Sequence, residues 1–188
     1  MRLGIDLDGV VANFTRGWMD FYNREFGTDL AEADSTRWND VVELTHFENI
    51  GEFWRWSSDL DGRSLFWHLE PFDGAVEALE TLSNDGHQIV IITTKPRFAV
   101  EDTHEWIAKH GIPADEVHIL EDKWLVECEV YLDDGPHILP RLVRERPEST
   151  VCRYVRPWNH PIEGVVDVHD FDEFRDVVSR VQATGLAG

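Results

Sequence analysis

Short apolar runs alternate with helical patterns along most of the chain, and this alternation constrains the fold more than any other feature. The runs are apolar throughout and rich in β-branched residues, which is typical of parallel strands that helices cover on both faces. They lie at residues 3–7, 89–93, 117–120, 130–133, 151–155 and 165–168. Because strand–helix–strand units build parallel sheets, the sequence predicts an α/β fold with a parallel sheet flanked by helices.

Four helical patterns lie between and after the later strands, at residues 72–86, 97–111, 137–146 and 170–182. In the first of them, Val76, Leu79 and Leu82 share one face, and Gly86 is placed to end the helix. The remaining residues, 183–188, are expected to be frayed.

Residues 14–71 break the alternation, because they contain no convincing strand. They hold five of the eight tryptophans, and aromatic residues recur at helical spacing from Phe14 and Trp18 onward. A unit of this length needs dense aromatic residues for a core of its own. We therefore expect a small helical domain inserted after the first strand of a core that comprises residues 1–13 and 72–182.

The charge of the chain is unusual. There are 37 acidic residues against 17 lysines and arginines, a net charge of -20, and the only lysines are Lys95, Lys109 and Lys123. The acids are scattered, as on a solvated surface, and their field would repel nucleic acids. This composition resembles that of proteins from salt-loving organisms. A basic protein partner, or solubility alone, would also account for it.

Several classes of protein are not expected. No run of about 18 apolar residues occurs, so no membrane-spanning helix is predicted, and the N-terminus does not resemble a signal peptide. Cys128 and Cys152 are too few for a disulfide framework, and the nine histidines lack the spacing of a zinc site. These features predict a protein of the reducing cytoplasm, and they favour no particular oligomeric state.

Polar side chains follow four of the predicted strands at the point where each strand ends. They are Asp6 and Asp8 after the first, Thr93, Thr94 and Lys95 after the second, Lys123 after the third, and Asp133 and Asp134 after the fourth. In an open parallel sheet, ligands bind beyond the carboxyl ends of the strands. One such acid is ordinarily a capping or solvated residue, but four strand ends that carry such groups together indicate a site.

The chemistry of this set favours a metal ion and a phosphate. Converging carboxylates repel one another, and a hard divalent cation such as Mg²⁺, which prefers oxygen ligands, relieves that repulsion. A lysine ammonium offsets the charge of a phosphate, and a threonine hydroxyl donates a hydrogen bond to it. The sequence therefore predicts a site that binds a divalent metal ion and a phosphate group.

Taken in order, the stretches DLDGV and ITT, a lysine, and the pair DD resemble the motifs of the haloacid dehalogenase superfamily of Mg²⁺-dependent phosphotransferases. The resemblance implies a Rossmann-like core with a cap between the first and second motifs, the place that residues 14–71 occupy. In this superfamily an aspartate two residues after the nucleophile, here Asp8, marks phosphatases and mutases, whereas ion pumps have threonine there. Hydrolysis of a phosphate ester is therefore implied.

The resemblance also implies a role for each motif residue. Asp6 resembles the nucleophile that forms an aspartyl-phosphate, and Asp8 resembles the general acid that later acts as a base. Gly9 would let the backbone approach the phosphate. Thr93 would donate a hydrogen bond to a phosphate oxygen, and Lys123 would neutralise charge on the nucleophile and the phosphoryl group.

The same resemblance implies a ligand set for Mg²⁺. It consists of the Asp6 carboxylate, the backbone carbonyl of Asp8 and the Asp133–Asp134 pair. In the pattern of the superfamily, the second acid of the pair is the direct ligand. Asp134 is therefore expected to bind the metal directly, and Asp133 through a water molecule.

The longer stretches DLDGVVANF and FWHLEPFDGAVEALETL resemble the 5′(3′)-deoxyribonucleotidase family, and ITTK, EDK and YLDD follow at similar spacing. This resemblance implies a nucleotide as the substrate. The second motif of that family usually continues Thr-Ser-Pro, whereas this chain has Thr93-Thr94-Lys95-Pro96. The departure adds a cation, and we expect Thr94 and Lys95 to lie near the phosphate.

Residues outside the motifs are open to two interpretations each. Trp67 is a candidate for stacking on the base and Trp18 for lining the mouth of the cleft, although aromatic residues of a small cap more often form its core. Trp158 and Asn159, in the stretch RPWNHP, either brace the site or only form a turn.

Two other functions also stay open. They are hydrolysis of another small phosphate ester, such as a sugar phosphate, and a non-catalytic binding role on the same fold.

Overall fold

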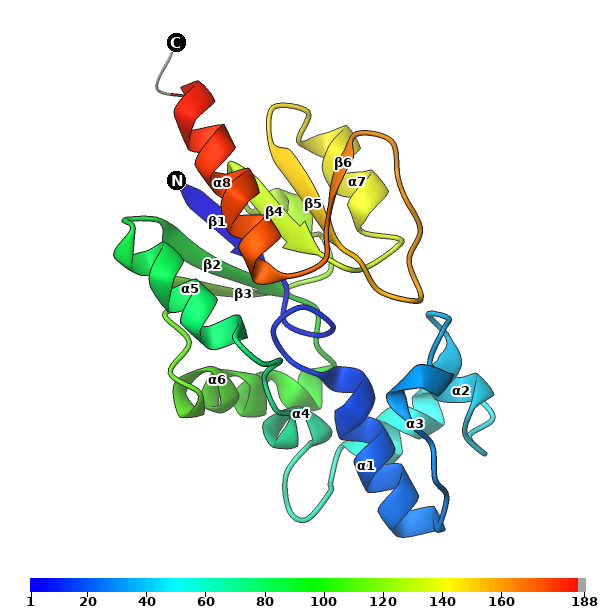
Figure 1. Cartoon of the computed structure of the whole chain (residues 1–188). Coiled ribbons are helices and arrows are strands. Elements are labelled where there is room, and N and C mark those ends of the chain that lie inside the picture. The colour runs from blue at the N-terminus through cyan, green and yellow to red at the C-terminus, as the bar shows by residue number, and fades with distance from the viewer. Residues whose placement is uncertain (186–188) are drawn as a thin grey trace.

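A computed structural model describes residues 1–185, and its centre is a sheet of six parallel strands (Figure 1). The strands are β1 (Arg2–Ile5), β2 (Gln88–Thr93), β3 (Glu116–Ile119), β4 (Val130–Asp133), β5 (Thr150–Tyr154) and β6 (Val165–Val168). Their order across the sheet is β3-β2-β1-β4-β5-β6, and every neighbouring pair is parallel. The α/β fold predicted from the alternating pattern is therefore confirmed.

Helices cover both faces of the sheet. They are α5 (Ala75–Asn84), α6 (Val100–Lys109), α7 (Leu139–Glu145) and α8 (Phe171–Gly185). Helices α5, α6 and α8 share a hydrophobic cluster with Ile89 and Ile91 of β2, whereas α7 shares a second cluster with Val90 and Ile92. Because side chains alternate across a strand, α5, α6 and α8 lie on one face and α7 on the other.

Two expectations about these elements need correction. The runs that form β3 and β6 are not covered on both faces, because these strands lie at the edges of the sheet and are partly exposed. Helix α8 continues to Gly185, since Val178 and Val181 hold it against the hydrophobic cluster, so residues 183–185 are helical rather than frayed. The rest of the expected frayed end, residues 186–188, lies outside the described residues. Within residues 1–185, no helix combines the length and apolar character that crossing a bilayer requires.

Between β1 and α5 the chain forms short helices, as the aromatic spacing predicts. They are α1 (Phe14–Phe26), the 3₁₀ turn η1 (Glu32–Asp34), α2 (Asp40–Glu43), α3 (Ile50–Ser57) and α4 (Leu65–His68). Asn13 caps α1 by accepting from the Arg16 amide at 3.1 Å, and Gly27 ends it with a φ of 66°. In Figure 1, α1, α2 and α3 lie beyond the carboxyl ends of the strands.

The insertion does not form a separate hydrophobic core. Trp18 of α1 belongs to the same buried cluster as Ile91 of the sheet. Helix α4 packs against α6, where the Trp106 indole donates to the Leu69 carbonyl at 2.6 Å. We keep residues 14–71 as a proposed cap, one whose core is continuous with that of the sheet.

The chain leaves the sheet and returns to it at neighbouring points. The Asn13 amide donates to the Glu70 carbonyl at 2.9 Å, and the Phe72 amide donates to the Val11 carbonyl at 2.8 Å. These two hydrogen bonds define a joint between the core and the insertion.

Candidate active site

Asp6 follows β1 directly, at the point where the strand order reverses, since β2 lies on one side of β1 and β4 on the other. Ligands of open α/β sheets bind at such a point. The Asp6 amide donates to the Leu132 carbonyl at 3.0 Å, and its Oδ1 accepts from the Leu7 amide at 2.8 Å. Strand β1 ends at Ile5 rather than at residue 7, so Asp6 and Asp8 lie in the turn beyond the strand.

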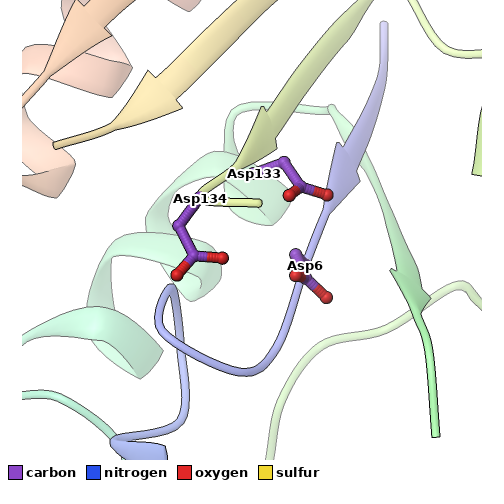
Figure 2. A group of neighbouring side chains, drawn as sticks. All are labelled: Asp6, Asp133 and Asp134. Atoms are coloured by element: carbon purple, nitrogen blue, oxygen red, sulfur yellow. The ribbon is translucent and has the colours of Figure 1, made fainter. Parts of the chain in front are cut away.

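Asp133 and Asp134, where β4 ends, bring their carboxylates to Asp6, as Figure 2 shows. One carboxylate oxygen from each of the three residues lies within 4.8 Å of the others, and all three residues are buried. Burial, together with the charges of Asp6 and Asp133, raises the pKa of Asp134 well above its usual range. Burial also raises the pKa of Asp133 to about 6, against the opposing charge of Lys123. The arrangement therefore concentrates negative charge that the fold does not fully neutralise.

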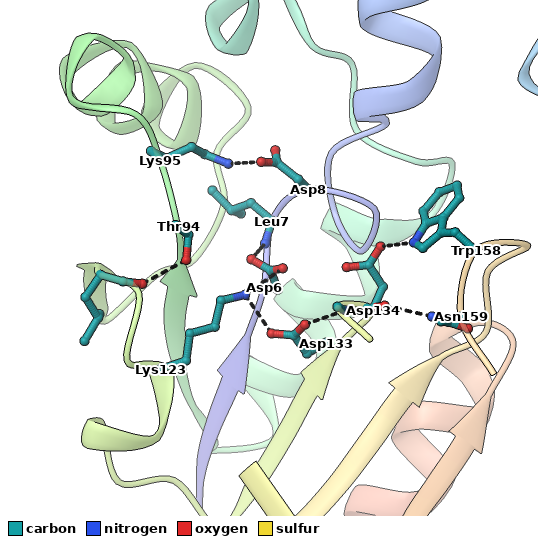
Figure 3. Close-up of polar contacts among 12 residues, drawn as sticks. Asp6, Leu7, Asp8, Thr94, Lys95, Lys123, Asp133, Asp134, Trp158 and Asn159 are labelled. Carbon is teal, nitrogen blue, oxygen red and sulfur yellow. Dashed lines mark hydrogen bonds and ion pairs between the residues drawn. The ribbon is translucent and has the colours of Figure 1, made fainter. Parts of the chain in front are cut away.

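Lys123, in the 3₁₀ turn η3 (Lys123–Leu125), lies between two of these carboxylates (Figure 3). Its Nζ is 2.8 Å from Asp6 Oδ2 and 2.7 Å from Asp133 Oδ2. Burial alone would lower the pKa of Lys123, but the charges of Asp133 and Asp6 outweigh burial and raise it. Asp134 forms no ion pair with any residue in 1–185, so its oxygen donors suit a hard cation such as Mg²⁺.

The Asp8 side chain points away from these three carboxylates, toward Lys95 (Figure 3). Its Oδ2 pairs with the Lys95 ammonium. Its Oδ1 is buried and has no hydrogen-bond partner in the described part of the chain. Burial raises the pKa of Asp8, and the Lys95 charge opposes that rise. Because one oxygen of this carboxyl group is held by Lys95 and the other has no hydrogen-bond partner, the second oxygen could carry the proton that a general acid transfers.

The two threonines that follow one another at the end of β2 differ in their contacts. Thr93 Oγ1 is buried and finds no protein partner among residues 1–185, whereas Thr94 Oγ1 donates to the Leu120 carbonyl at 3.0 Å. A buried donor without a partner is costly, so the free hydroxyl of Thr93 is available to a ligand.

Gly9 has a φ of 75°, and a Cβ atom at this position would lie 2.1 Å from Asp134 Oδ2. Only glycine fits so close to that carboxylate. The sequence interpretation assigned Gly9 to an approach of the backbone to phosphate. The structure gives a second reason for glycine at this position, which is that the Asp134 carboxylate lies where a side chain would begin.

A cavity of about 670 Å³ connects these groups with the insertion. On the core side it is lined by predicted site residues, namely Asp6, Asp8, Gly9, Thr93, Thr94, Lys123, Asp133 and Asp134. Its aromatic lining comes from both the insertion and the core: Phe14, Trp18, Trp38, Trp54, Trp124 and Trp158. Trp18 contributes to this wall although its side chain is almost entirely buried, so it belongs to the core as well.

Two predicted site residues are not brought to the cavity wall. Trp67 lies elsewhere on α4, with the Lys109 ammonium 4.4 Å from its ring centroid. Lys95 lies behind Asp8 rather than beside the space for a phosphate. The motif pattern did not predict that His137 lines the cavity, where its ring centroid lies 5.0 Å from that of Trp38. In the sequence, only its position three residues after Asp134 suggests that it lies near the site.

The turn that contains Trp158 and Asn159 contacts the site residue Asp134, so it is more than a connecting turn. Trp158 Nε1 donates to Asp134 Oδ2 at 2.9 Å, and Asn159 Nδ2 donates to the Asp134 carbonyl at 2.9 Å. Arg153, paired with Asp167, donates to Asn159 Oδ1 at 2.9 Å. A chain of polar contacts therefore leads from the sheet to the backbone of Asp134.

Replacing Asn159 by Ala is expected to weaken the binding of a divalent cation at Asp6, Asp133 and Asp134 by about 10-fold, because groups that orient a metal ligand contribute about that much to affinity. A calorimetric titration of the protein with Mg²⁺ measures the effect. Asn23→Ala is the matched control, since Asn23 donates to the Leu30 carbonyl at 2.8 Å outside the cavity. A similar shift in both variants would mean that Asn159 only contributes to general stability.

Comparisons with known proteins agree with this site. The family described as 5′ nucleotidase, deoxy (pyrimidine), cytosolic type C protein (NT5C) matches residues 1–184. The mitochondrial 5′(3′)-deoxyribonucleotidase of Mus musculus is 26% identical over 145 residues, which cover 73% of this chain and 66% of that protein. The 5′(3′)-deoxyribonucleotidase of Bacillus subtilis (strain 168) is 25% identical over 141 residues, or 73% of this chain and 77% of that protein.

Solved structures share the fold at low identity. A haloacid dehalogenase superfamily hydrolase from Ehrlichia chaffeensis has a TM-score of 0.56 and 12% identity, with 96% of each chain covered. A hydrolase of the same superfamily from Deinococcus radiodurans R1 has a TM-score of 0.60 and 14% identity, again with 96% of each chain covered. The match over residues 1–184 shows that the chain belongs to the NT5C family of 5′-nucleotidases.

Proposed function

We propose that this chain is a Mg²⁺-dependent phosphomonoester hydrolase that acts on nucleoside monophosphates, ribo or deoxyribo, through an aspartyl-phosphate on Asp6. The observation that carries the proposal is the convergence of the Asp6, Asp133 and Asp134 carboxylates at the switch point of the sheet, where Lys123 pairs with two of them, Asp6 and Asp133. Asp8 and the unpartnered hydroxyl of Thr93 line the same cavity.

The residues that would hold Mg²⁺ are Asp6, Asp134, the Asp8 carbonyl and, through water, Asp133. When bound, the ion would neutralise charge on the nucleophile and the phosphoryl oxygens. The donor set supports this role, because it consists of oxygen atoms and because Lys123 leaves Asp134 unpaired.

In the first step the Asp6 carboxylate attacks phosphorus, the ester P–O bond breaks, and Asp8 transfers its proton to the leaving oxygen. In the second step water attacks the aspartyl-phosphate, Asp8 takes a proton from that water, and the bond between phosphorus and Asp6 breaks. Inorganic phosphate then leaves. Thr93 donates to a phosphoryl oxygen, and Lys123 offsets the negative charge that develops.

The size and lining of the cavity support a nucleoside as the leaving group. About 670 Å³ is far more than a phosphate group needs, and ring-bearing side chains of the insertion, such as Trp38 and Trp54, form part of its wall. Aromatic side chains stack on nucleobases because both present flat π faces. The related proteins that are named 5′(3′)-deoxyribonucleotidases also support a nucleotide as the substrate.

A panel of phosphate esters tests the proposal. We expect nucleoside 5′- or 3′-monophosphates to exceed sugar phosphates by about 10-fold or more in kcat/KM, since stacking contributes about 1–3 kcal/mol per base. The panel includes p-nitrophenyl phosphate, which reports phosphatase chemistry without recognition of a base. A preference for sugar phosphates would replace the nucleotide assignment, and no turnover of any ester would indicate a binding protein.

We also propose a cytoplasmic location, which is supported by the two cysteines, Cys128 and Cys152, both free and buried. The small-molecule ester is the only partner proposed. Nucleic acids are disfavoured, because a net charge of -20 repels their phosphates.

The acidic composition supports adaptation to high salt. A net charge of -20 makes the folded state repel itself, and the range of this repulsion falls from about 30 Å at about 0.01 M salt to about 3 Å at about 1 M. If screening adds ~3 kcal/mol, Tm is expected to rise by about 10 °C between dilute and molar KCl. Thermal melts across a KCl series measure this, with sucrose as an uncharged control. Equal melting temperatures throughout would remove the halophilic interpretation.

A further inference from the structure

Lys95 is a buried cation that the steps above do not use. Its side chain is 2% exposed, and lysine is rarely so buried without a partner. It follows Thr94, where the sequence departs from the usual Thr-Ser-Pro of the related nucleotidases. The structure turns its ammonium to Asp8 and leaves it out of the cavity wall, so Lys95 does not meet a bound phosphate directly.

The ammonium of Lys95 is held from two sides. On one side it pairs with Asp8 Oδ2, and on the other it lies 4.7 Å from the ring centroid of Phe66 in α4. The Phe66 ring is itself stacked on Phe14 at 5.9 Å and on Trp54 at 6.0 Å, and both of these line the cavity. A cation above an aromatic face is attracted to it, most strongly where water is excluded. Lys95 is therefore fixed by the insertion as well as by Asp8.

This contact determines how Asp8 can face a substrate. With Oδ2 engaged by Lys95, rotation of the carboxylate is restricted, and Oδ1 remains as the oxygen without a partner in residues 1–185. Asp8 lines the cavity, and its Oδ1, buried and without a hydrogen bond in the described residues, is the oxygen that Lys95 leaves unoccupied. Catalytic groups need such fixed directions to transfer protons efficiently.

We propose that Lys95 is a positioning residue that directs Asp8 Oδ1 toward the leaving oxygen of the substrate. The inference rests on the proposed function, in which Asp8 protonates that oxygen. The proton passes from Asp8 Oδ1 to the ester oxygen as the P–O bond breaks, while Oδ2 keeps its hydrogen bond from Lys95. Lys95 retains its own protons throughout.

The test compares two leaving groups in Lys95→Met, which keeps the apolar stem and removes the ammonium. A nucleoside alkoxide must be protonated as it leaves, whereas p-nitrophenolate leaves without a proton. The comparison uses kcat/KM, which reports only the formation of the aspartyl-phosphate, because Asp8 also serves as the base in its hydrolysis, a step that both esters share. We expect kcat/KM for a nucleoside 5′-monophosphate to fall by about 100-fold, in the range of general acid catalysis, and kcat/KM for p-nitrophenyl phosphate to fall by less than about 5-fold. Lys95→Arg should recover much of the lost kcat/KM.

Lys109→Met is the matched control, because Lys109 also contacts a ring of α4, that of Trp67, but no carboxylate of the site. It should leave both rates unchanged. Asp8→Asn provides the reference, and an equal loss of kcat/KM on both esters in this variant would refute the acid role of Asp8 and the inference with it. If Asp8→Asn distinguishes the esters in kcat/KM but Lys95→Met lowers kcat/KM equally for both, Lys95 does not position Asp8.

Phe66→Leu keeps the test decisive if Lys95→Met fails to fold. It removes the ring beside the ammonium and retains both charges. We expect the ratio of kcat/KM for the nucleotide to kcat/KM for the aryl phosphate to fall several-fold, the size of effect that loss of an exposed or partly buried cation–π contact produces. An unchanged ratio in folded Phe66→Leu would then overturn the inference.

Discussion

Asp6→Asn is expected to lower kcat by about 10⁴-fold or more, as the removal of a covalent nucleophile does in other enzymes. The amide cannot form the proposed aspartyl-phosphate, and the substitution also removes a carboxylate from the proposed metal site. The fold should persist, because Asn keeps an acceptor for the Leu7 amide, which now donates to Asp6 Oδ1 at 2.8 Å. Steady-state kinetics with a nucleotide and an aryl phosphate measure the loss, and a thermal melt verifies folding. A variant that keeps more than about 1% of the wild-type rate would refute the role of Asp6 as nucleophile.

Removal of divalent ions should have an effect of similar size. After treatment with EDTA, turnover of every ester is expected to stop, and Mg²⁺ should restore it, because the charges of Asp6, Asp133 and Asp134 lie together with only one lysine between them. Ca²⁺ should restore little, since its larger and more flexible coordination shell does not hold the nucleophile in line.

The same experiment has a thermodynamic readout. At a Mg²⁺ concentration of about 100 times its Kd, the folded state gains about 2.7 kcal/mol, so Tm should rise beyond what equal ionic strength of KCl produces. Asp134→Asn is the matched variant and should lose that extra rise. Full activity of the wild type without divalent ions would contradict the metal-dependent mechanism.

The motif residues could be predicted from the sequence because each lies directly after a strand. Parallel topology places the carboxyl ends of all the strands at one edge of the sheet, so these residues could be expected on the same side. The strand order, which the sequence did not predict, places β4 beside β1 and so brings Asp133 and Asp134 to Asp6. The end of β1 could not be predicted to the residue. Leu7 is apolar like the residues of the strand, but its carbonyl accepts hydrogen bonds from amides of the tight turn that follows.

Residues of the insertion could not be placed in the same way. Trp54 and Trp67 look alike in sequence, yet one lines the cavity and the other lies against Lys109, because their positions depend on how α3 and α4 pack. Lys95 shows a similar limit at the end of β2. Its backbone position is predicted by the motif, but its pairing with the partly exposed carboxylate of Asp8 decides where its long side chain points.

The joint at Asn13 and Phe72 has a consequence for how such proteins diversify. Because the outgoing and returning segments are hydrogen-bonded neighbours, the length of the chain between them places no geometric demand on the sheet. An insertion of different length can be accommodated there without moving Asp6 if it keeps the packing of Trp18 and α4 against the core. Such a change would alter the wall of the cavity while Asp6, Asp133 and Asp134 stay together.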